Sequence, residues 1–253
     1  MKRILAIHAH PDDLEILLGG TLALLAAAGH SVTMATMTAG DCGSAERTSR
    51  EISQIRLTEA RASAALIHAE YVCCGFQDLN IFNTDPSRRR VTEILRSVRP
   101  DIVITASPTD YLADHEATSA LVKDASFAAP VPLYGTGGGT PAPALGAIPH
   151  LYFMDPLTGL DNAGNAAIPD FGVDISAWFA IKRKMLEQHV SQREWLRKHH
   201  GMDDYIHQMT VSTRETGARF GAEYGEGLRQ YRGHAYPHSP LLQEMLGGNL
   251  RYT

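Results

Sequence analysis

The chain has 253 residues, enough for one large α/β domain, and its 44% hydrophobic and 20% charged residues are typical of an ordinary globular protein. Lys and Arg total 23 against 28 Asp and Glu, a formal net charge of −5, so no overall basic field exists to attract nucleic acid or an anionic membrane. Twelve histidines stand out, because histidine is the commonest metal ligand and acid–base group near neutral pH.

The three cysteines are odd in number and two of them, Cys73 and Cys74, are adjacent, which is a poor pattern for disulfides. Polar residues from His8 to Asp13 interrupt any secretory signal. The longest apolar stretch, residues 14–28, contains Glu15 and is too short to span a bilayer. These features predict a cytoplasmic protein with no nucleic-acid or membrane partner.

Short apolar runs alternate with longer helix-like segments over the first half of the chain. The apolar runs predict buried strands at 4–7, 31–38, 71–74 and 102–105. The segments between them predict helices at 14–29, 44–68 and 89–98. This alternation continues through residue 127 and indicates an α/β fold, a mostly parallel sheet with helices on both faces.

The pattern breaks at residues 128–149, where five prolines and the glycine run 137–139 predict a long, lid-like loop. No internal repeat and no second domain are evident, so residues 1–253 are predicted to form a single domain. Beyond the loop we expect strands at 150–154 and 172–175, helices at 176–189, 191–200 and 202–220, and an irregular C-terminal arm over 221–253.

Side chains that can bind a metal or move a proton gather in two loops that follow predicted strands. His10, Asp12 and Asp13 come directly after the first strand, and Pro11 restricts His10 to an extended backbone. The loop after the fourth strand ends at His115. Ligands of parallel α/β sheets bind beyond the carboxyl ends of the strands, so both loops should open on one edge and His115 should reach the first cluster.

Two imidazoles and one carboxylate suit zinc, with one position left open for water and substrate. A second carboxylate then remains to take a proton from the attacking water. Either Asp12 or Asp13 fills that role while the other binds the metal. The predicted chemistry is hydrolysis of an amide or ester through a tetrahedral intermediate.

The motifs also occur in a recognisable order along the chain. Residues 9–13, Ala-His-Pro-Asp-Asp, are followed by Gly-Gly-Thr-Leu at 19–22, and further matching segments lie at 38–41, 55–60, 75–78, 114–115 and 184–192. In this order the chain resembles the PIG-L/LmbE-like zinc deacetylases, and the resemblance covers most of its length.

This resemblance implies a Rossmann-like fold, hydrolysis of the acetamide of N-acetylglucosamine-containing compounds, and assembly as a homo-oligomer, a trimer or hexamer. The implied cofactor is Zn2+, and the implied partner is a small-molecule amino-sugar substrate. The resemblance places His10, Asp13 and His115 as zinc ligands and Asp12 as the general base. The residues implied to shape the sugar pocket are Arg56, Asp78 and Asp41.

Further residues are candidates to support the site from behind. Asp110 and Asp114 are expected to orient a ligand histidine, with Asp114 the better candidate. His189 follows a predicted helix, where a histidine favours the helix dipole, and is a second candidate to support the site. His8 alternates with His10 in the first strand and is expected to be a core histidine or to touch the site from within.

One position departs from the family pattern. The second family motif is usually His-Pro-Asp-His, whereas this chain has Leu-Ala-Asp-His at residues 112–115. The histidine missing at Leu112 normally stabilises the oxyanion or protonates the leaving amine. Three interpretations follow: His150, His189 or Tyr134 substitutes for it, catalysis is slower, or the protein binds a sugar without turning it over.

Two other functions compete with the hydrolase. One is a non-catalytic sugar-binding module, which the leucine at position 112 suggests. The other is an Fe(II) oxygenase, because two histidines and one carboxylate also form its metal triad. Oxygenases of that kind usually have jelly-roll folds, so the alternation of strands and helices favours the hydrolase.

Overall fold

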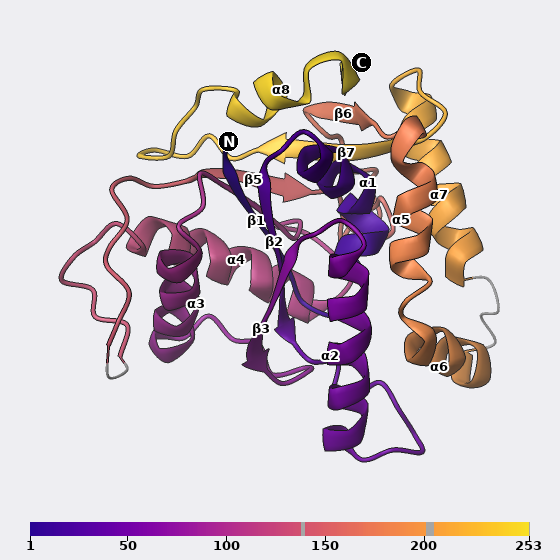
Figure 1. Cartoon of the computed structure of the whole chain (residues 1–253), viewed down its shortest axis with the longest axis horizontal. Helices are drawn as coiled ribbons and strands as arrows, with labels where there is room; N and C mark the ends of the chain where they lie inside the picture. The colour runs from indigo at the N-terminus through magenta and orange to yellow at the C-terminus, as the bar shows by residue number, and fades with distance from the viewer. Residues whose placement is uncertain (138–139, 201–204, 253) are drawn as a thin grey trace.

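The computed structural model describes residues 1–137, 140–200 and 205–252, and within them the strands form a single mixed sheet (Figure 1). The order across the sheet is β3-β2-β1-β4-β5-β7-β6-β8. The strands are β1 (Arg3–His8), β2 (Ser31–Thr38), β3 (Glu70–Phe76), β4 (Ile102–Thr105), β5 (His150–Met154), β6 (Phe171–Asp174), β7 (Gly225–Gln230) and β8 (Leu250–Arg251).

The first five strands of the chain are all parallel, and β1 lies between β2 and β4. Every residue of β4 is buried, as expected of a parallel strand covered on both faces. The remaining strands, β7, β6 and β8, continue the sheet in antiparallel pairs. The predicted α/β fold is therefore confirmed, and it does not suit the jelly-roll oxygenase alternative.

The helices cover both faces of the sheet. Figure 1 shows α3 and α4 on one side and α1, α2 and α5 on the other. The described helices are α1 (Asp13–Ala27), α2 (Ser49–Ala65), α3 (Asp85–Val98), α4 (Ala113–Ala128), α5 (Phe179–Leu186), α6 (Val190–His200), α7 (Tyr205–Arg219) and α8 (Leu241–Leu246).

Capping residues correct two predicted helix starts. Thr48 and Glu51 form a capping box, so α2 begins at Ser49 and not at residue 44. The side chain of Thr84 accepts a hydrogen bond from the backbone of Ser87, so α3 begins at Asp85, four residues before the predicted start. The expected helix 176–189 is divided into a 3-10 turn, Ser176–Trp178, and α5.

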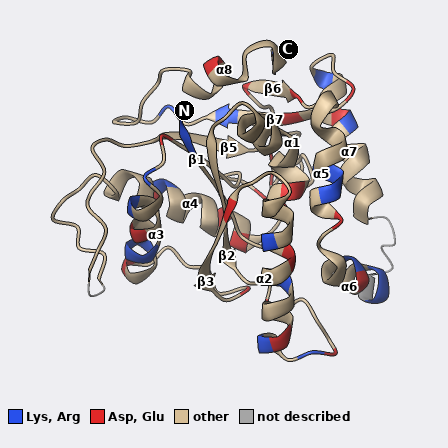
Figure 2. Cartoon of the chain, viewed as in Figure 1, with Lys and Arg blue, Asp and Glu red and all other residues tan. Residues whose placement is uncertain are grey.

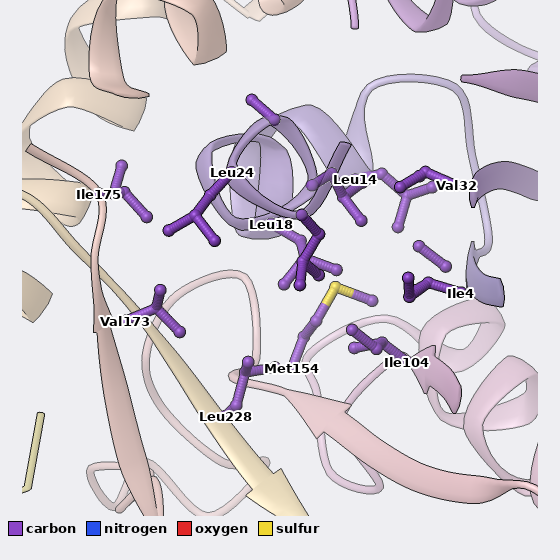
Figure 3. Close-up of a cluster of buried hydrophobic side chains, with 14 of the residues drawn as sticks. Ile4, Leu14, Leu18, Leu24, Val32, Ile104, Met154, Val173, Ile175 and Leu228 are labelled. Carbon is purple, nitrogen blue, oxygen red and sulfur yellow. The ribbon is translucent and has the colours of Figure 1, made fainter. Parts of the chain in front are cut away.

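The apolar face of α1 packs directly on the sheet. Figure 3 shows Leu14 and Leu18 of this helix beside Ile4 of β1 and Ile104 of β4, with the sulfur of Met154 close by. Burying a leucine side chain contributes about 1.5–3 kcal/mol, so this helix fixes the loop that immediately precedes it. A second buried cluster, with Val91 of α3 and Leu121 of α4 among its members, fills the opposite face.

Charged side chains lie mainly on the outer helices. Figure 2 shows Lys, Arg, Asp and Glu interspersed along α2 and α3, while most of the central sheet is uncharged. No helix in the described part of the chain has the length and apolar character needed to cross a membrane.

The segment 221–253 is not the irregular arm that we expected. Within its described part it contains α8, β8 and the sheet strand β7, which lies between β5 and β6. The sequence of β7, Gly-Glu-Gly-Leu-Arg-Gln, has one large apolar residue and so gives no hydrophobic signal, although four of its first five residues are buried.

The loop at 128–149 joins the end of α4 to the start of β5, and residues 138–139 lie outside the described part. A helix returns the chain to the opposite edge of a parallel sheet, so this loop runs at the edge away from the carboxyl ends of the parallel strands. Glu93 of α3 binds it through the hydroxyl of Thr136 and the backbone N–H of Ala142. This position does not support a role as a lid.

Candidate active site

A cavity of about 700 Å³ opens where β1 and β4 end, at the edge of the sheet that the sequence indicated. His10, Asp12, Asp13 and His115 all line it, so the two loops meet as predicted. The other described residues lining its walls are Ile16, Cys42, Gly43, Arg56, Asp78, Leu79, Tyr111, Leu112, Leu157, Thr158, Gln192, Trp195, Leu196, Tyr205, Gln208, Met209, Val211, Ser212 and Glu215.

Of the three predicted zinc ligands, His10 and His115 each place a ring nitrogen close to one carboxylate oxygen of Asp13. Asp13 Oδ2 lies 3.5 Å from His10 Nδ1 and 3.5 Å from His115 Nε2. Ligand atoms about 2.1 Å from a tetrahedral zinc ion are about 3.4 Å apart. Each of these two separations fits a pair of atoms that bind one zinc ion, whereas the group of ligand atoms that all lie within 4.8 Å of one another contains His8 in place of His10.

His8 also lies against Asp13, but in a different relationship. The buried triad His8, Asp13 and His115 has potential ligand atoms all within 4.8 Å of one another. However, His8 Nδ1 lies 2.6 Å from Asp13 Oδ2, which is a hydrogen-bond distance and too short for two atoms that bind the same ion. His8 is therefore placed to hold Asp13 from the core side.

Each of the two candidate ligand histidines has its second ring nitrogen beside a carboxylate. His10 Nε2 lies 3.1 Å from Asp114 Oδ2, and His115 Nδ1 lies 3.1 Å from Asp110 Oδ1. Metal-binding histidines commonly have such a partner, which fixes the orientation of the ring. Asp110 and Asp114 both occupy this position, so each serves one histidine.

Asp12 lies next to Asp13 but in a different environment. Its backbone is left-handed, with φ of 104°, at the residue that precedes α1. The hydroxyl of Tyr205 donates to Asp12 Oδ2, and the Arg56 guanidinium lies 3.4 Å from Asp12 Oδ1. Asp12 is thus held from two sides while it still lines the cavity.

The pKa values of the two adjacent carboxyl groups move in opposite directions. Burial raises the pKa of Asp12, and the nearby Arg56 only partly opposes this. Burial also acts to raise the pKa of Asp13, but the imidazoles of His8 and His115 outweigh it and hold that pKa well below its usual value. Asp13 therefore stays anionic, as a ligand must, and Asp12 is the group suited to accept a proton.

The three residues expected to shape a sugar pocket are placed differently from one another. Arg56 is only 3% exposed, and its Nη2 donates to Pro11 O at 2.7 Å. Asp78 lines the cavity with Oδ1 4.0 Å from His10 Nε2. Asp41 is not among the lining residues, and its Oδ1 accepts the backbone N–H of Asp78, which ties two loops together.

His189 lies behind the cavity wall and not in it. Its Nε2 is 3.0 Å from Glu15 Oε1, and the same oxygen accepts the hydroxyl of Ser63 at 2.6 Å. All three side chains are buried. Glu15 lies in the first turn of α1, where an acidic residue is ordinary, so the sequence alone does not indicate its contact with His189.

None of the three candidates for the missing histidine lines the cavity. Leu112 itself does, at the residue before α4. His150 begins β5, at the opposite edge of the sheet, with Nε2 2.8 Å from the Ser239 hydroxyl. Tyr134 donates its hydroxyl to Asp85. The residue that sequence reasoning missed is Tyr205, which is 193 positions from Asp12 and belongs to no local motif.

Comparison with known proteins agrees with this geometry. The profile of the PIG-L family, described as GlcNAc-PI de-N-acetylase, matches residues 5–126, a range that includes His10, Asp13 and His115. Diacetylchitobiose deacetylase of Thermococcus kodakarensis is 27% identical over 202 residues, which are 76% of this chain and 70% of the relative. The first half of the chain is therefore similar to the PIG-L family.

Two further deacetylases are similar to the chain over different lengths. A 1D-myo-inositol 2-acetamido-2-deoxy-alpha-D-glucopyranoside deacetylase of Rhodococcus erythropolis is 30% identical over 162 residues, and the match spans 51% of this chain and 55% of that protein. The N,N'-diacetylchitobiose deacetylase structure from Pyrococcus horikoshii aligns with a TM-score of 0.73 and 25% identity, covering 95% of this chain and 88% of the other.

The same fold also occurs in a protein with a different reaction. GalB, the 4-carboxy-2-hydroxymuconate hydratase of Pseudomonas putida KT2440, aligns with a TM-score of 0.76 at 21% identity, over 94% of this chain and 99% of that one. This likeness concerns the fold alone. The fold alone therefore does not define the reaction, which depends on the residues of the site.

Proposed function

We propose that this protein is a zinc-dependent hydrolase of the PIG-L type that removes the N-acetyl group from an N-acetylglucosamine-type amino sugar or glycoside. The observation that carries the proposal is the arrangement at Asp13, whose Oδ2 lies 3.5 Å from both His10 Nδ1 and His115 Nε2. These three side chains would hold Zn2+. The adjacent Asp12 is left to act as the general base.

When bound, zinc would polarise the acetamide carbonyl and make water more acidic. The protein's own residues supply the rest. Asp12 takes the proton of the attacking water, and Arg56 keeps its carboxylate directed at the cavity. Behind the ligands, Asp110 and Asp114 fix the two imidazole rings, which reduces the reorganisation needed when a metal binds.

The charge of the cavity favours an uncharged sugar over an anionic substrate. Arg56 is the one arginine or lysine among the described lining residues, and its guanidinium is already directed at Asp12 and Pro11. A carboxylate or phosphate group on a substrate would find no further arginine or lysine among these described residues to pair with. We assign Asp78 to contact with the sugar, whereas Arg56 and Asp41 act by holding the loops around it.

The named relatives act on small acetamido sugars, which agrees with this choice. We extend the proposal to a cytoplasmic protein that assembles as a homo-oligomer, a trimer or hexamer, as the family resemblance implies. The ligands and the base all come from one chain, so the chemistry itself does not require a second subunit.

The test is to incubate zinc-loaded protein with a panel of N-acetyl sugars and glycosides and to measure free amine and acetate by mass spectrometry. We expect stoichiometric release of both from at least one uncharged acetamido sugar. The Asp12→Asn protein is the matched control and should release neither. If the panel yields no acetate while sugars bind measurably, the protein is a sugar-binding module and the proposal fails.

A further inference from the structure

The hydroxyl of Tyr205 lies against the proposed base from inside the cavity. Tyr205 is the first residue of α7, is 6% exposed, and is one of the lining residues. Its hydroxyl donates to Asp12 Oδ2, while Arg56 approaches the other oxygen of the same carboxylate. The phenol and the carboxylate therefore form one hydrogen-bonded pair that faces the substrate space.

Amide hydrolysis needs a proton donor for the leaving nitrogen, because an amine anion does not leave. The family histidine that would donate is replaced by Leu112, whose side chain has no proton to give. The cavity offers two phenols, Tyr205 and Tyr111. Tyr111 is 60% exposed on the rim, with its ring 5.8 Å from that of His115, whereas Tyr205 is buried and touches the base.

We propose that the Tyr205 hydroxyl is the proton donor that replaces the missing histidine at position 112, a step that rests on the deacetylase function proposed above. Asp12 accepts one proton from water as the bond from the water oxygen to the acetyl carbon forms. As the carbon–nitrogen bond breaks, the phenolic proton passes to the nitrogen and Tyr205 takes the proton from Asp12. The products are the free amine and acetic acid, and both side chains return to their starting states.

The surroundings of Tyr205 keep its proton in place between turnovers. Burial, together with the neighbouring Asp12 carboxylate, holds the pKa of Tyr205 well above its usual value, so the phenol remains protonated. Leu186 and Met209 pack around it in a small apolar cluster. A fixed ring of this kind keeps the donor aligned on the base without further movement.

The experiment compares Tyr205→Phe with wild type, both zinc-loaded, on an acetamido sugar and on 4-nitrophenyl acetate. The nitrophenolate leaves without a proton, so only the amide reaction needs the donor. We expect kcat for the amide to fall at least about 100-fold with KM within about threefold, while ester hydrolysis stays within about threefold. Tyr111→Phe is the matched control and should lose less than about tenfold on the amide.

Two results would overturn the proposal. If Tyr205→Phe cleaves the amide at the wild-type rate, Tyr205 is not the donor. If amide and ester rates fall by the same factor, the phenol only positions Asp12. Asp12→Asn should lose both reactions, which establishes that the ester uses the same site. Failure of the wild-type protein to cleave any acetamido sugar would instead reject the function itself.

Discussion

Asp12 and Asp13 are neighbours in the sequence, yet their side chains have separate tasks. The left-handed backbone at Asp12 places its carboxylate between Arg56 and Tyr205, whereas Asp13 begins α1 and faces the imidazoles. A left-handed conformation costs an ordinary residue about 1–2 kcal/mol, and Asp and Asn tolerate it best. The strain is therefore located at the residue that must be held in one orientation.

We expect Asp12→Asn and His115→Ala to separate catalysis from metal binding. Asparagine suits the left-handed backbone, so Asp12→Asn should keep its zinc and its fold while turnover falls about 10²–10⁴-fold. His115→Ala removes a ligand and should lose the zinc. Metal analysis and amine release measure the two effects, with His150→Ala, at the opposite edge of the sheet, as the control. Equal zinc contents and equal activities in both variants would contradict the assignment.

Gly40 is the position at which a single methyl group should disturb the base. Its φ is +72°, and a Cβ there would lie 2.5 Å from the Arg56 guanidinium. Gly29 has a φ of +84° but open space around it. Both alanine variants should lose about 1 kcal/mol of unfolding free energy from backbone strain. Only Gly40→Ala should also lose turnover, because its methyl group would displace the Arg56 guanidinium. An equal loss of turnover in Gly29→Ala would show that displacement of Arg56 does not explain the effect.

At the scale of elements, α1 is joined to β7 and α5 by a buried charge pair. Glu226 of β7 accepts the backbone N–H groups of Gly20 and Thr21, in the middle of α1, and lies 2.6 Å from the Lys182 ammonium of α5. Burial lowers the pKa of Lys182, and Glu226 opposes that shift. Since α1 begins at Asp13, this contact also fixes the helix that carries this proposed metal ligand.

Lys182→Met should destabilise the protein far more than the same change at the next position. Removing one partner leaves Glu226 charged and buried, which costs about 3–5 kcal/mol. Arg183 makes an exposed pair with Glu187, so Arg183→Met should cost no more than about 0.5 kcal/mol. Urea unfolding measures both, and Lys182→Met with Glu226→Gln should recover part of the loss. If the two methionine variants lost similar amounts of unfolding free energy, the buried charge pair would not have the effect expected here.

At the scale of the whole molecule, the stability should fall between acid and neutral pH because of Asp155. Burial raises its pKa to about 6, although Arg229 and Arg219 partly oppose this. Because the pKa of Asp155 is higher in the folded protein than in the unfolded chain, folding favours the protonated carboxyl group. The protein therefore loses stability as this group ionises, between about pH 4 and pH 6. The loss is on the order of 2–3 kcal/mol and is complete above that range.

Asp155→Asn keeps the shape of the side chain and cannot ionise. Its unfolding free energy should therefore exceed that of wild type at pH 8, and the difference should shrink at pH 5. Denaturant melts of both proteins at the two pH values provide the measurement. A difference that stays constant with pH would mean that Asp155 ionises as readily in the folded state as in the unfolded chain.

The parallel half of the fold could be read from the sequence because burial on both faces leaves continuous apolar runs. Ser31–Thr38 and Ile102–Thr105 were predicted with the observed bounds. β7 could not be found in this way, since its buried groups include Glu226, whose charge is balanced by a residue 44 positions away. Only the folded structure shows that pairing.

The meeting of the two loops at one cavity was predictable for a related reason. Parallel strands bring their carboxyl ends to one edge, so the loops that contain His10 and His115 had to meet. Tyr205 reaches the same cavity from α7, which packs on the antiparallel strands β6 and β7. No rule of sequence spacing connects Tyr205 with Asp12. The ring partners Asp110 and Asp114 were named, but only the structure shows which histidine each one serves.

Tyr205 and the proposed metal ligands lie on distant parts of the chain. His10 follows β1, and Asp13 and His115 lie in the first turns of α1 and α4, whereas Tyr205 begins α7. The phenol is held in place by the packing of α7 on β6 and β7. Loosening of that helix alone would leave the proposed ligands in place and Asp12 without its partner. Under the proposed function, the protein would then lose catalytic competence while still carrying its metal.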